Sequence, residues 1–97
     1  MIRREGTRVV LSGPVTLENA RAVLEEGSAQ IRSGARSIDL GEVSELDSSL
    51  LAVLLVWQRE ARSEQGMLAM EQVPEGLATI ARLYGVEAFL TGAAPGH

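Results

Sequence analysis

Strand-like stretches at the start of the chain predict a β-hairpin. Segments 2–4 and 8–11 have the character of short strands, and they flank the turn-forming pair 6–7. Segment 12–14, with the sequence Ser-Gly-Pro, is expected to end the second strand, because glycine and proline interrupt regular structure. The chain is therefore expected to open with two short paired strands.

The pattern then becomes helical. Apolar residues recur near helical spacing from Thr16, the expected N-cap, to about Gly34, which predicts an amphipathic helix. Segment 36–40 is a brief predicted strand, and segment 41–46 is expected to be a loop. Segment 50–65 begins with an apolar run that is too long for one strand and lacks alternation, so it predicts a mostly buried helix.

The last third of the chain predicts one more strand and one more helix. Segment 67–71 is strand-like, and Pro74 occupies a favoured first-turn position for the helix that follows. The apolar face of this helix is expected to comprise Leu77, Ile80, Ala81 and Tyr84. Gly85 should cap the helix, segment 86–90 could add one helical turn, and the Gly/Ala/Pro-rich tail 91–97 is expected to be loose.

The order of these elements predicts the architecture. Ninety-seven residues suffice for one compact domain, 1–97, and are too few for two. Strands that alternate with helices through short links imply parallel pairing through right-handed crossovers. The helices should pack on one side of the sheet, which leaves the opposite face open or covered by a partner.

Composition and charge exclude several classes of function. The formal net charge is −4, and no run of basic residues exceeds the pair Arg3-Arg4, so neither nucleic acid nor an anionic membrane surface is an expected partner. The absence of cysteine excludes disulfides and thiolate chemistry. No apolar run approaches the roughly 20 residues of a membrane span, and there is no signal-peptide pattern, so the chain is expected to be cytoplasmic without direct membrane insertion.

Catalytic chemistry finds little support in the residues. The one histidine is His97 at the end of the sequence, so a nucleophile inside the fold would have no histidine base. Phosphate-binding glycine motifs are missing, and no cofactor is expected. The acidic residues Asp39, Glu42, Glu45 and Asp47 do not have the spacing of a calcium loop, so they are interpreted as a solvated turn and not as a metal site.

The triplet Asp47-Ser48-Ser49 lies where a strand and loop meet the long helix. Backbone N–H groups and the positive end of the helix dipole point outward there. A hydroxyl at this place can cap the helix, or it can be presented to a partner or to a kinase. The triplet alone leaves both roles open.

Two segments resemble a known family. Segment 38–49 (IDLGEVSELDSS), followed by an apolar helix, is similar to the signature of STAS domains, which occur in sulfate transporters and anti-sigma factor antagonists. Segment 73–86 contains Ala-Arg-Leu-Tyr-Gly and resembles the MlaB family, the STAS subunits of the Mla phospholipid-trafficking ABC transporter. The resemblance spans nearly the whole chain and implies an α/β fold with a four-stranded mixed sheet and helices packed on one face.

The resemblance also implies a role for Ser48. The hydroxyl residue directly after the aspartate is the regulatory position of STAS proteins: a kinase phosphorylates it in anti-sigma factor antagonists, and in the MlaB family it lies in the contact with the ATPase subunit. One departure is Leu50, where the family usually has glycine. Its side chain adds bulk near Ser48, either inward to the core or outward to a partner.

The helix after Ser49 supplies a second argument for docking. Val53 and Trp57 lie away from the Leu51 side, so a helix buried on one face only would leave them near the surface, as in interface hot spots. The alternative is that Trp57 packs under the N-terminal helix. The predicted partner-binding surface comprises Asp47, Ser48, Ser49, Leu50, Leu51, Val53 and Trp57.

The sequence therefore favours a non-catalytic accessory subunit of a lipid-transport ABC transporter. It would dock on the cytoplasmic ATPase subunit, stabilise or regulate it, and reach the permease and the inner membrane only through that complex. An exposed apolar patch would also permit a weak homodimer. The alternative is an anti-sigma factor antagonist, a signalling switch phosphorylated at Ser48.

Overall fold

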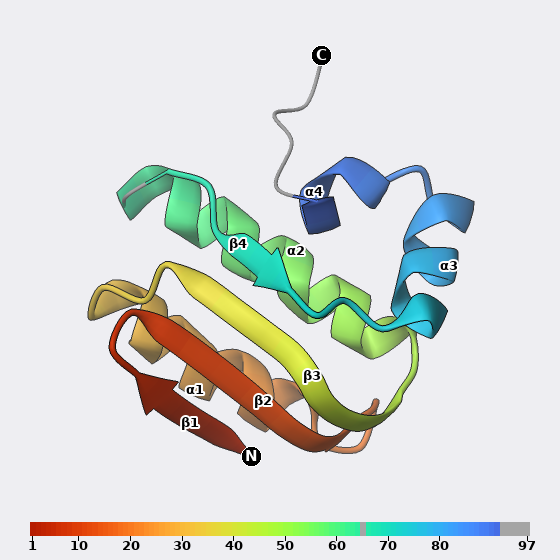
Figure 1. The fold of residues 1–97 in the computed structure, drawn as a ribbon, viewed down its shortest axis with the longest axis horizontal. Coiled ribbons are helices and arrows are strands. Elements are labelled where there is room, and N and C mark those ends of the chain that lie inside the picture. Colours follow the sequence, from red (N-terminus) through yellow and green to blue (C-terminus); the bar gives the residue numbers. More distant parts are fainter. Residues whose placement is uncertain (65, 92–97) are drawn as a thin grey trace.

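Four strands form one mixed sheet that is flanked by helices (Figure 1). The computed structural model describes residues 1–64 and 66–91. The strands, which pair in the order β1-β2-β3-β4, are β1 (Ile2–Glu5), β2 (Arg8–Val15), β3 (Ser37–Leu46) and β4 (Ala69–Glu71). The helices are α1 (Ala20–Arg32), α2 (Ser48–Glu64), α3 (Glu75–Leu83) and α4 (Glu87–Thr91).

The pairing confirms the predicted hairpin and the parallel crossovers. Strands β1 and β2 are antiparallel, with Glu5 opposite Arg8, and Gly6 adopts a positive φ of 63° in the turn between them. The pairs β2–β3 and β3–β4 are parallel, and α1 and α2 are the respective connections. The sheet is therefore mixed, as expected.

Two segments expected to lie outside strands belong to the sheet. Segment 12–14 does not end β2, and segment 41–46 is the second half of β3 and not a loop. The two segments pair with each other, for example Gly13 with Val43, through register irregularities on either side of Ser12-Gly13. Such irregularities tolerate a proline that has no N–H to donate and a glycine at a φ of 82°.

The first helix begins later than predicted. Thr16 is not its N-cap: α1 starts at Ala20 and ends at Arg32, two residues before Gly34. The intervening turn is held by Asn19, whose Oδ1 accepts the N–H of Thr16 at 2.9 Å and whose Nδ2 donates to the carbonyl of Pro14 at 2.9 Å. The side chain of Asn19 thereby fixes a turn instead of capping the helix.

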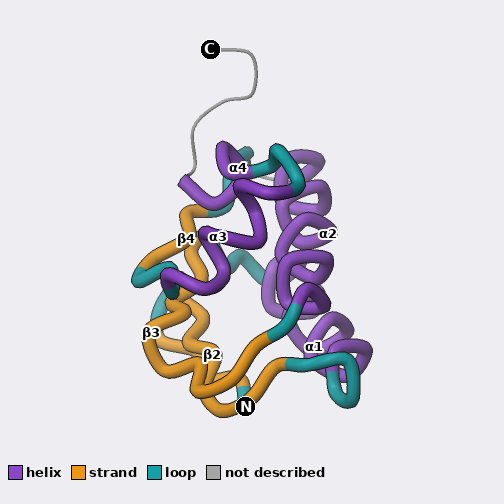
Figure 2. Tube along the Cα trace, turned by 90° about the vertical axis from the view of Figure 1, so that its right-hand side faces the viewer, coloured by secondary structure: helices purple, strands orange, loops and turns teal. Residues whose placement is uncertain are grey.

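The core lies between the sheet and helices α1 and α2, which cover one face (Figure 2). Trp57 of α2 is fully buried against α1, and its Nε1 donates to the carbonyl of Leu24 at 3.1 Å. Gly27 of α1 faces the indole so closely that a Cβ atom there would overlap the ring. The alternative in which Trp57 packs under the N-terminal helix is thus the one the structure adopts.

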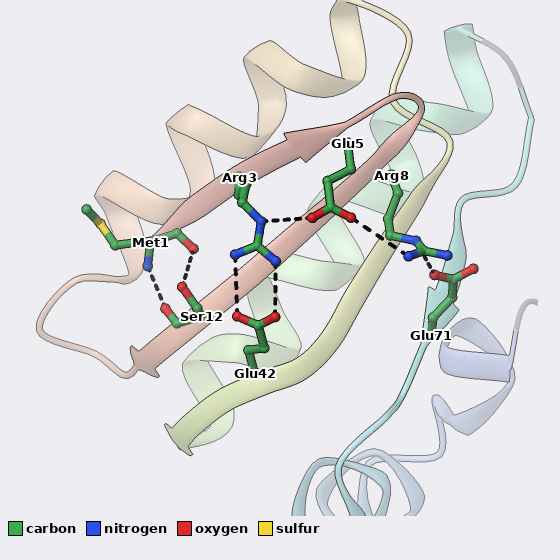
Figure 3. Close-up of polar contacts among 7 residues, drawn as sticks. All are labelled: Met1, Arg3, Glu5, Arg8, Ser12, Glu42 and Glu71. Atoms are coloured by element: carbon green, nitrogen blue, oxygen red, sulfur yellow. Dashed lines mark hydrogen bonds and ion pairs between the residues drawn. The ribbon is translucent and has the colours of Figure 1, made fainter.

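The opposite face of the sheet is charged (Figure 3). Arg3 pairs with Glu5 at 2.9 Å and, across β2, with Glu42 at 3.0 Å. Arg8 pairs with Glu71 at 3.1 Å, across β3, and with Glu5 at 3.9 Å. These five side chains form a chain of ion pairs over all four strands, and we call them the charge chain.

Gln58, a buried residue of α2, binds the segment before β4 and helix α4. Its Nε2 donates to the carbonyls of Leu68 (2.7 Å) and Phe89 (2.9 Å), and its Oε1 accepts the N–H of Leu68 at 2.9 Å. Gly85, with a φ of 72°, ends the preceding helical segment as predicted. Residues 92–97 of the predicted tail lie outside the described residues.

Two details of α3 differ from expectation. Pro74 is the N-cap of the helix and not its first residue. Leu77 and Ala81 are buried as predicted and Ile80 is half-buried, but Tyr84 is 66% exposed. Tyr84 follows the helix at its C-cap, where the chain already leaves the face that packs on the core.

Candidate docking face on helix α2

Asp47 connects the start of α2 to the end of β2. Its Oδ1 accepts the N–H of Ser49 at 2.8 Å, and its Oδ2 accepts the N–H of Leu17 at 3.1 Å. Both bonds favour the ionised carboxylate, so the N–H of Leu17 and then that of Ser49 lower the pKa of Asp47 below its usual range. Asp47 therefore caps α2 and at the same time fixes the 16–19 turn beside it.

Because Asp47 supplies the cap, the hydroxyl of Ser48 is free for other contacts. Ser48 is the first residue of α2 and is exposed. Among the described residues, its hydroxyl has no hydrogen-bond partner. Of the two roles that the sequence left open for this triplet, capping belongs to Asp47, and Ser48 is presented at the surface.

Four of the predicted site residues face inward. Leu50 and Trp57 are fully buried, and Leu51 and Val53 are 3% and 4% exposed. The prediction that Val53 and Trp57 lie near the surface is wrong, because α2 packs against α1 as well as the sheet and so buries two faces instead of one. Leu50 takes the inward of its two alternatives and adds no bulk beside Ser48 at the surface.

The outward stripe of α2 is formed by other residues. Ser48, Ala52, Leu55 and Val56 follow one another at helical spacing, and Ala52 is exposed while Leu55 and Val56 are half-buried. We call this stripe the α2 ridge. Of the larger set predicted from the sequence, Ser48 belongs to this ridge, and Asp47 and Ser49 are half-buried next to it in the chain.

Two open apolar cavities flank the α2 ridge. The first, of about 220 Å³, lies between α1 and α2, and its lining includes Ala20, Leu24 and Val56. The second, of about 300 Å³, lies on the other side, where Tyr84 and Val86 face Leu55. Ala52 lines both cavities, and its small side chain leaves them open on either side of the helix. The α2 ridge and its cavities form a largely apolar surface with Ser48 at one end.

Sequence reasoning missed two exposed residues beside this surface. Leu17 is 79% exposed, in a turn whose backbone is bound by Asp47, and Tyr84 lines the same cavity as Ser48. The helix predicted to begin after Thr16 would have included Leu17 among its apolar residues, and Tyr84 was expected on the apolar face of the later helix. The signal for Leu17 was the Asn19 turn that precedes the helix, and for Tyr84 it was the adjacent Gly85, which places the tyrosine at the end of its helix.

The site has few groups suited to other chemistry. Among residues 1–64 and 66–91, no group of three or more histidine, aspartate or glutamate side chains could hold a metal ion. Asp39 instead accepts the N–H of Gly41 at 2.8 Å, and Glu42 belongs to the charge chain. In the same described ranges, no helix combines the length and apolar character needed to cross a membrane.

A mixed four-stranded sheet with an aspartate-capped helix directly after its longest strand agrees with the class of protein that the comparisons show, the STAS domains. The sequence model of the family described as "Mlab, STAS domain" matches residues 2–92, and the chain therefore belongs to the MlaB-type STAS family. No curated protein matches the chain in a sequence search.

Solved structures agree with this assignment. The chain is similar to the MlaB subunit of the Acinetobacter MlaFEDB complex in an ATP-bound conformation, with a TM-score of 0.73, 26% identity, and coverage of 87% of this chain and 90% of that one. A candidate anti-sigma factor antagonist from Thermotoga maritima shares the fold with a TM-score of 0.73, 19% identity, and coverage of 94% and 82%. The phosphorylated form of the Bacillus cell fate determinant SpoIIAA does so with 0.67, 19%, and coverage of 99% and 91%.

Proposed function

We propose that this chain is a non-catalytic accessory subunit of a bacterial lipid-transport ABC complex and that it docks on the cytoplasmic ATPase subunit. The observation that supports the proposal is the α2 ridge with an apolar cavity on each side, in a chain that belongs to the MlaB-type STAS family. The similar Acinetobacter chain is part of an MlaFEDB complex. Contact with the permease and the inner membrane would follow through the ATPase.

The chemistry of the surface suits a protein partner. Apolar side chains of the partner would fill the two cavities, and the exposed Leu17 and Tyr84 would be covered at their edges. Ser48 can donate or accept a hydrogen bond at the rim, close to the positive end of the α2 dipole. Binding only to the folded ATPase would stabilise that subunit by mass action.

Ala52 offers the sharpest test, because it is exposed, lines both cavities and is not one of the residues of the core cluster. Ala52→Arg should weaken association with the ATPase subunit of the proposed complex at least about tenfold, which corresponds to roughly 1.4 kcal/mol. Biolayer interferometry with both proteins purified would measure it. Ala29→Arg, a matched change on the exposed side of α1, should leave binding unchanged.

Two results would count against the proposal. One is that the wild-type chain and the ATPase, both folded, do not associate. The other is that Ala52→Arg binds as tightly as Ala29→Arg.

A second candidate function is a phosphorylation switch of the anti-sigma factor antagonist type. The observation that favours it is the exposed Ser48 in the first turn of α2, where a phosphate is favoured by the helix dipole. The buried Leu50 does not obstruct access to that hydroxyl. A stoichiometric mass increase of one phosphate after incubation with a cognate kinase, lost in Ser48→Ala, would support the switch; an unmodified mass would exclude it for that kinase.

A further inference from the structure

A third cavity lies farther along α2, beyond the α2 ridge. It has a volume of about 350 Å³ and is lined by Leu55, Arg59, Arg62, Val86 and Phe89. Three apolar side chains form one part of its wall, and two arginines from successive turns of α2 form the other. Leu55 also lines the cavity that contains Tyr84, so this α2–α4 cup continues the surface described above.

The two arginines of the cup differ from those on the sheet face. Arg3 and Arg8 each pair with carboxylates, whereas no ion pair joins Arg59 or Arg62 to any of the side chains that the structure describes. Both are exposed, and residues three apart on a helix lie side by side. A chain of net charge −4 therefore presents a local positive pair beside an apolar hollow.

Two arginines beside an apolar hollow indicate which chemical groups a ligand of the cup would carry. A carboxylate can bind a guanidinium through two parallel hydrogen bonds, and two neighbouring guanidiniums suit two carboxylates spaced along a peptide. The apolar wall requires a large aliphatic or aromatic side chain between them. An anionic membrane surface fits less well, because the net charge of the whole chain opposes attachment to it.

We infer that the α2–α4 cup binds an acidic amphipathic segment of a protein partner. One large apolar side chain of the segment occupies the hollow formed by Leu55, Val86 and Phe89, and flanking carboxylates pair with Arg59 and Arg62. Arg59, Arg62 and Phe89 lie outside the two cavities proposed for the ATPase contact, whereas Leu55 and Val86 are shared with one of them. The inference does not require the ATPase, because it would hold for any partner with such a segment.

A random peptide library displayed on phage provides a probe of defined composition. Selection on the full-length chain should enrich peptides that combine aspartate or glutamate with leucine or phenylalanine. The synthesised peptides should shift the methyl and ring signals of Leu55, Val86 and Phe89 in NMR spectra. The double variant R59Q/R62Q should bind them at least about tenfold more weakly, and added salt should weaken wild-type binding more than variant binding.

The double variant R32Q/R36Q is the matched control, because it removes the same charge at two exposed positions outside the cup and should bind the peptides like wild type. The inference is overturned if no acidic peptides are enriched, if R59Q/R62Q binds them normally, or if the signals that shift belong to another surface. It is also overturned if vesicles of phosphatidylglycerol bind the chain through Arg59 and Arg62 while the peptides do not, or if the cup proves to be buried in a homodimer by sedimentation and NMR.

These outcomes are separable from a failure of the proposed function. Ala52→Arg should impair ATPase binding without affecting the selected peptides, whereas R59Q/R62Q should lose the peptides regardless of whether the ATPase binds. If the chain binds acidic peptides in the cup but does not bind the ATPase, the inference is supported and the proposed function is contradicted.

Discussion

At the scale of single residues, Asp47 shows how one carboxylate can define a surface. Its two oxygens accept N–H groups from Ser49 and Leu17, which belong to different elements. The bond to Ser49 leaves the hydroxyl of Ser48 uncommitted, and the bond to Leu17 holds an apolar side chain in solvent. The exposure of Ser48 and Leu17, at the edge of the candidate docking face, therefore depends on the ionised state of Asp47.

The pH dependence of stability should reflect this residue. The lowered pKa of Asp47 means that its carboxylate stabilises the fold at any pH above the ordinary aspartate value of about 3.9, and that this contribution is lost as the pH falls through the lower folded value. Asp47→Asn should lower the urea midpoint at pH 7, because its amide oxygen replaces only one of the two acceptors. The difference from wild type should shrink below pH about 4.

Asp39→Asn serves as the comparison, since Asp39 accepts a single N–H, that of Gly41. It should lower the midpoint less than Asp47→Asn. An Asp47→Asn deficit that stays constant down to the acid transition would show that the charge of this carboxylate contributes nothing to stability.

At the scale of elements, the sequence predicted which helices and strands form more accurately than where each of them begins and ends. Each predicted helix and strand is present, because local spacing of apolar residues and the glycines and prolines between them report on local structure. Segments 12–14 and 41–46 were assigned wrongly because each is a strand only by virtue of pairing with the other, about 30 residues away. Local pattern carries no information on such pairing.

The site residues show the same division between local and non-local information. The position of Asp47 and Ser48 at the start of α2 followed from the local sequence and from the family resemblance. The burial of Val53 and Trp57 did not, because it depends on a second helix packed against α2. The one sequence feature related to this burial is Gly27, a glycine within a predicted helix. That Gly27 lies against another side chain becomes clear only from the fold.

Because Gly27 lies directly against Trp57, the addition of one methyl group at position 27 should lower the stability of the fold strongly. Gly27→Ala would place a Cβ inside the indole ring, so α1 and α2 would have to separate, at a cost of about 1–3 kcal/mol in the free energy of unfolding. Urea denaturation followed by tryptophan fluorescence would measure it. Gly76→Ala in α3, where a Cβ meets nothing within 4 Å, should be neutral or slightly stabilising. Equal stabilities of the two variants would contradict the close packing.

At the scale of the whole molecule, one buried polar side chain links the end of the chain to α2, in addition to the apolar core contacts of Leu77, Ala81 and Leu90. Gln58 bonds the backbone next to β4 and the backbone of α4 at once, and both cavities beside Val86 depend on α4 and its preceding loop staying in place. A side chain of α2 thus helps to position the C-terminal residues that line these two cavities.

Gln58→Leu should therefore loosen one region selectively. It leaves the N–H and carbonyl of Leu68 and the carbonyl of Phe89 without their partner, and we expect a loss of about 2–3 kcal/mol in the free energy of unfolding. Hydrogen exchange should accelerate in segment 84–91 more than in α1. Uniform acceleration across the chain would show instead that Gln58 supports the core as a whole.

The charge chain has a consequence for the side from which partners can reach the molecule. Its two arginines already pair with its three glutamates, so a protein that lay on this side would have to strip water from five ionised groups without supplying better partners. Every apolar hollow described above opens on the helical side. We therefore expect the sheet face to stay in contact with water in any assembly, so that every protein that binds this molecule reaches it from the helical side.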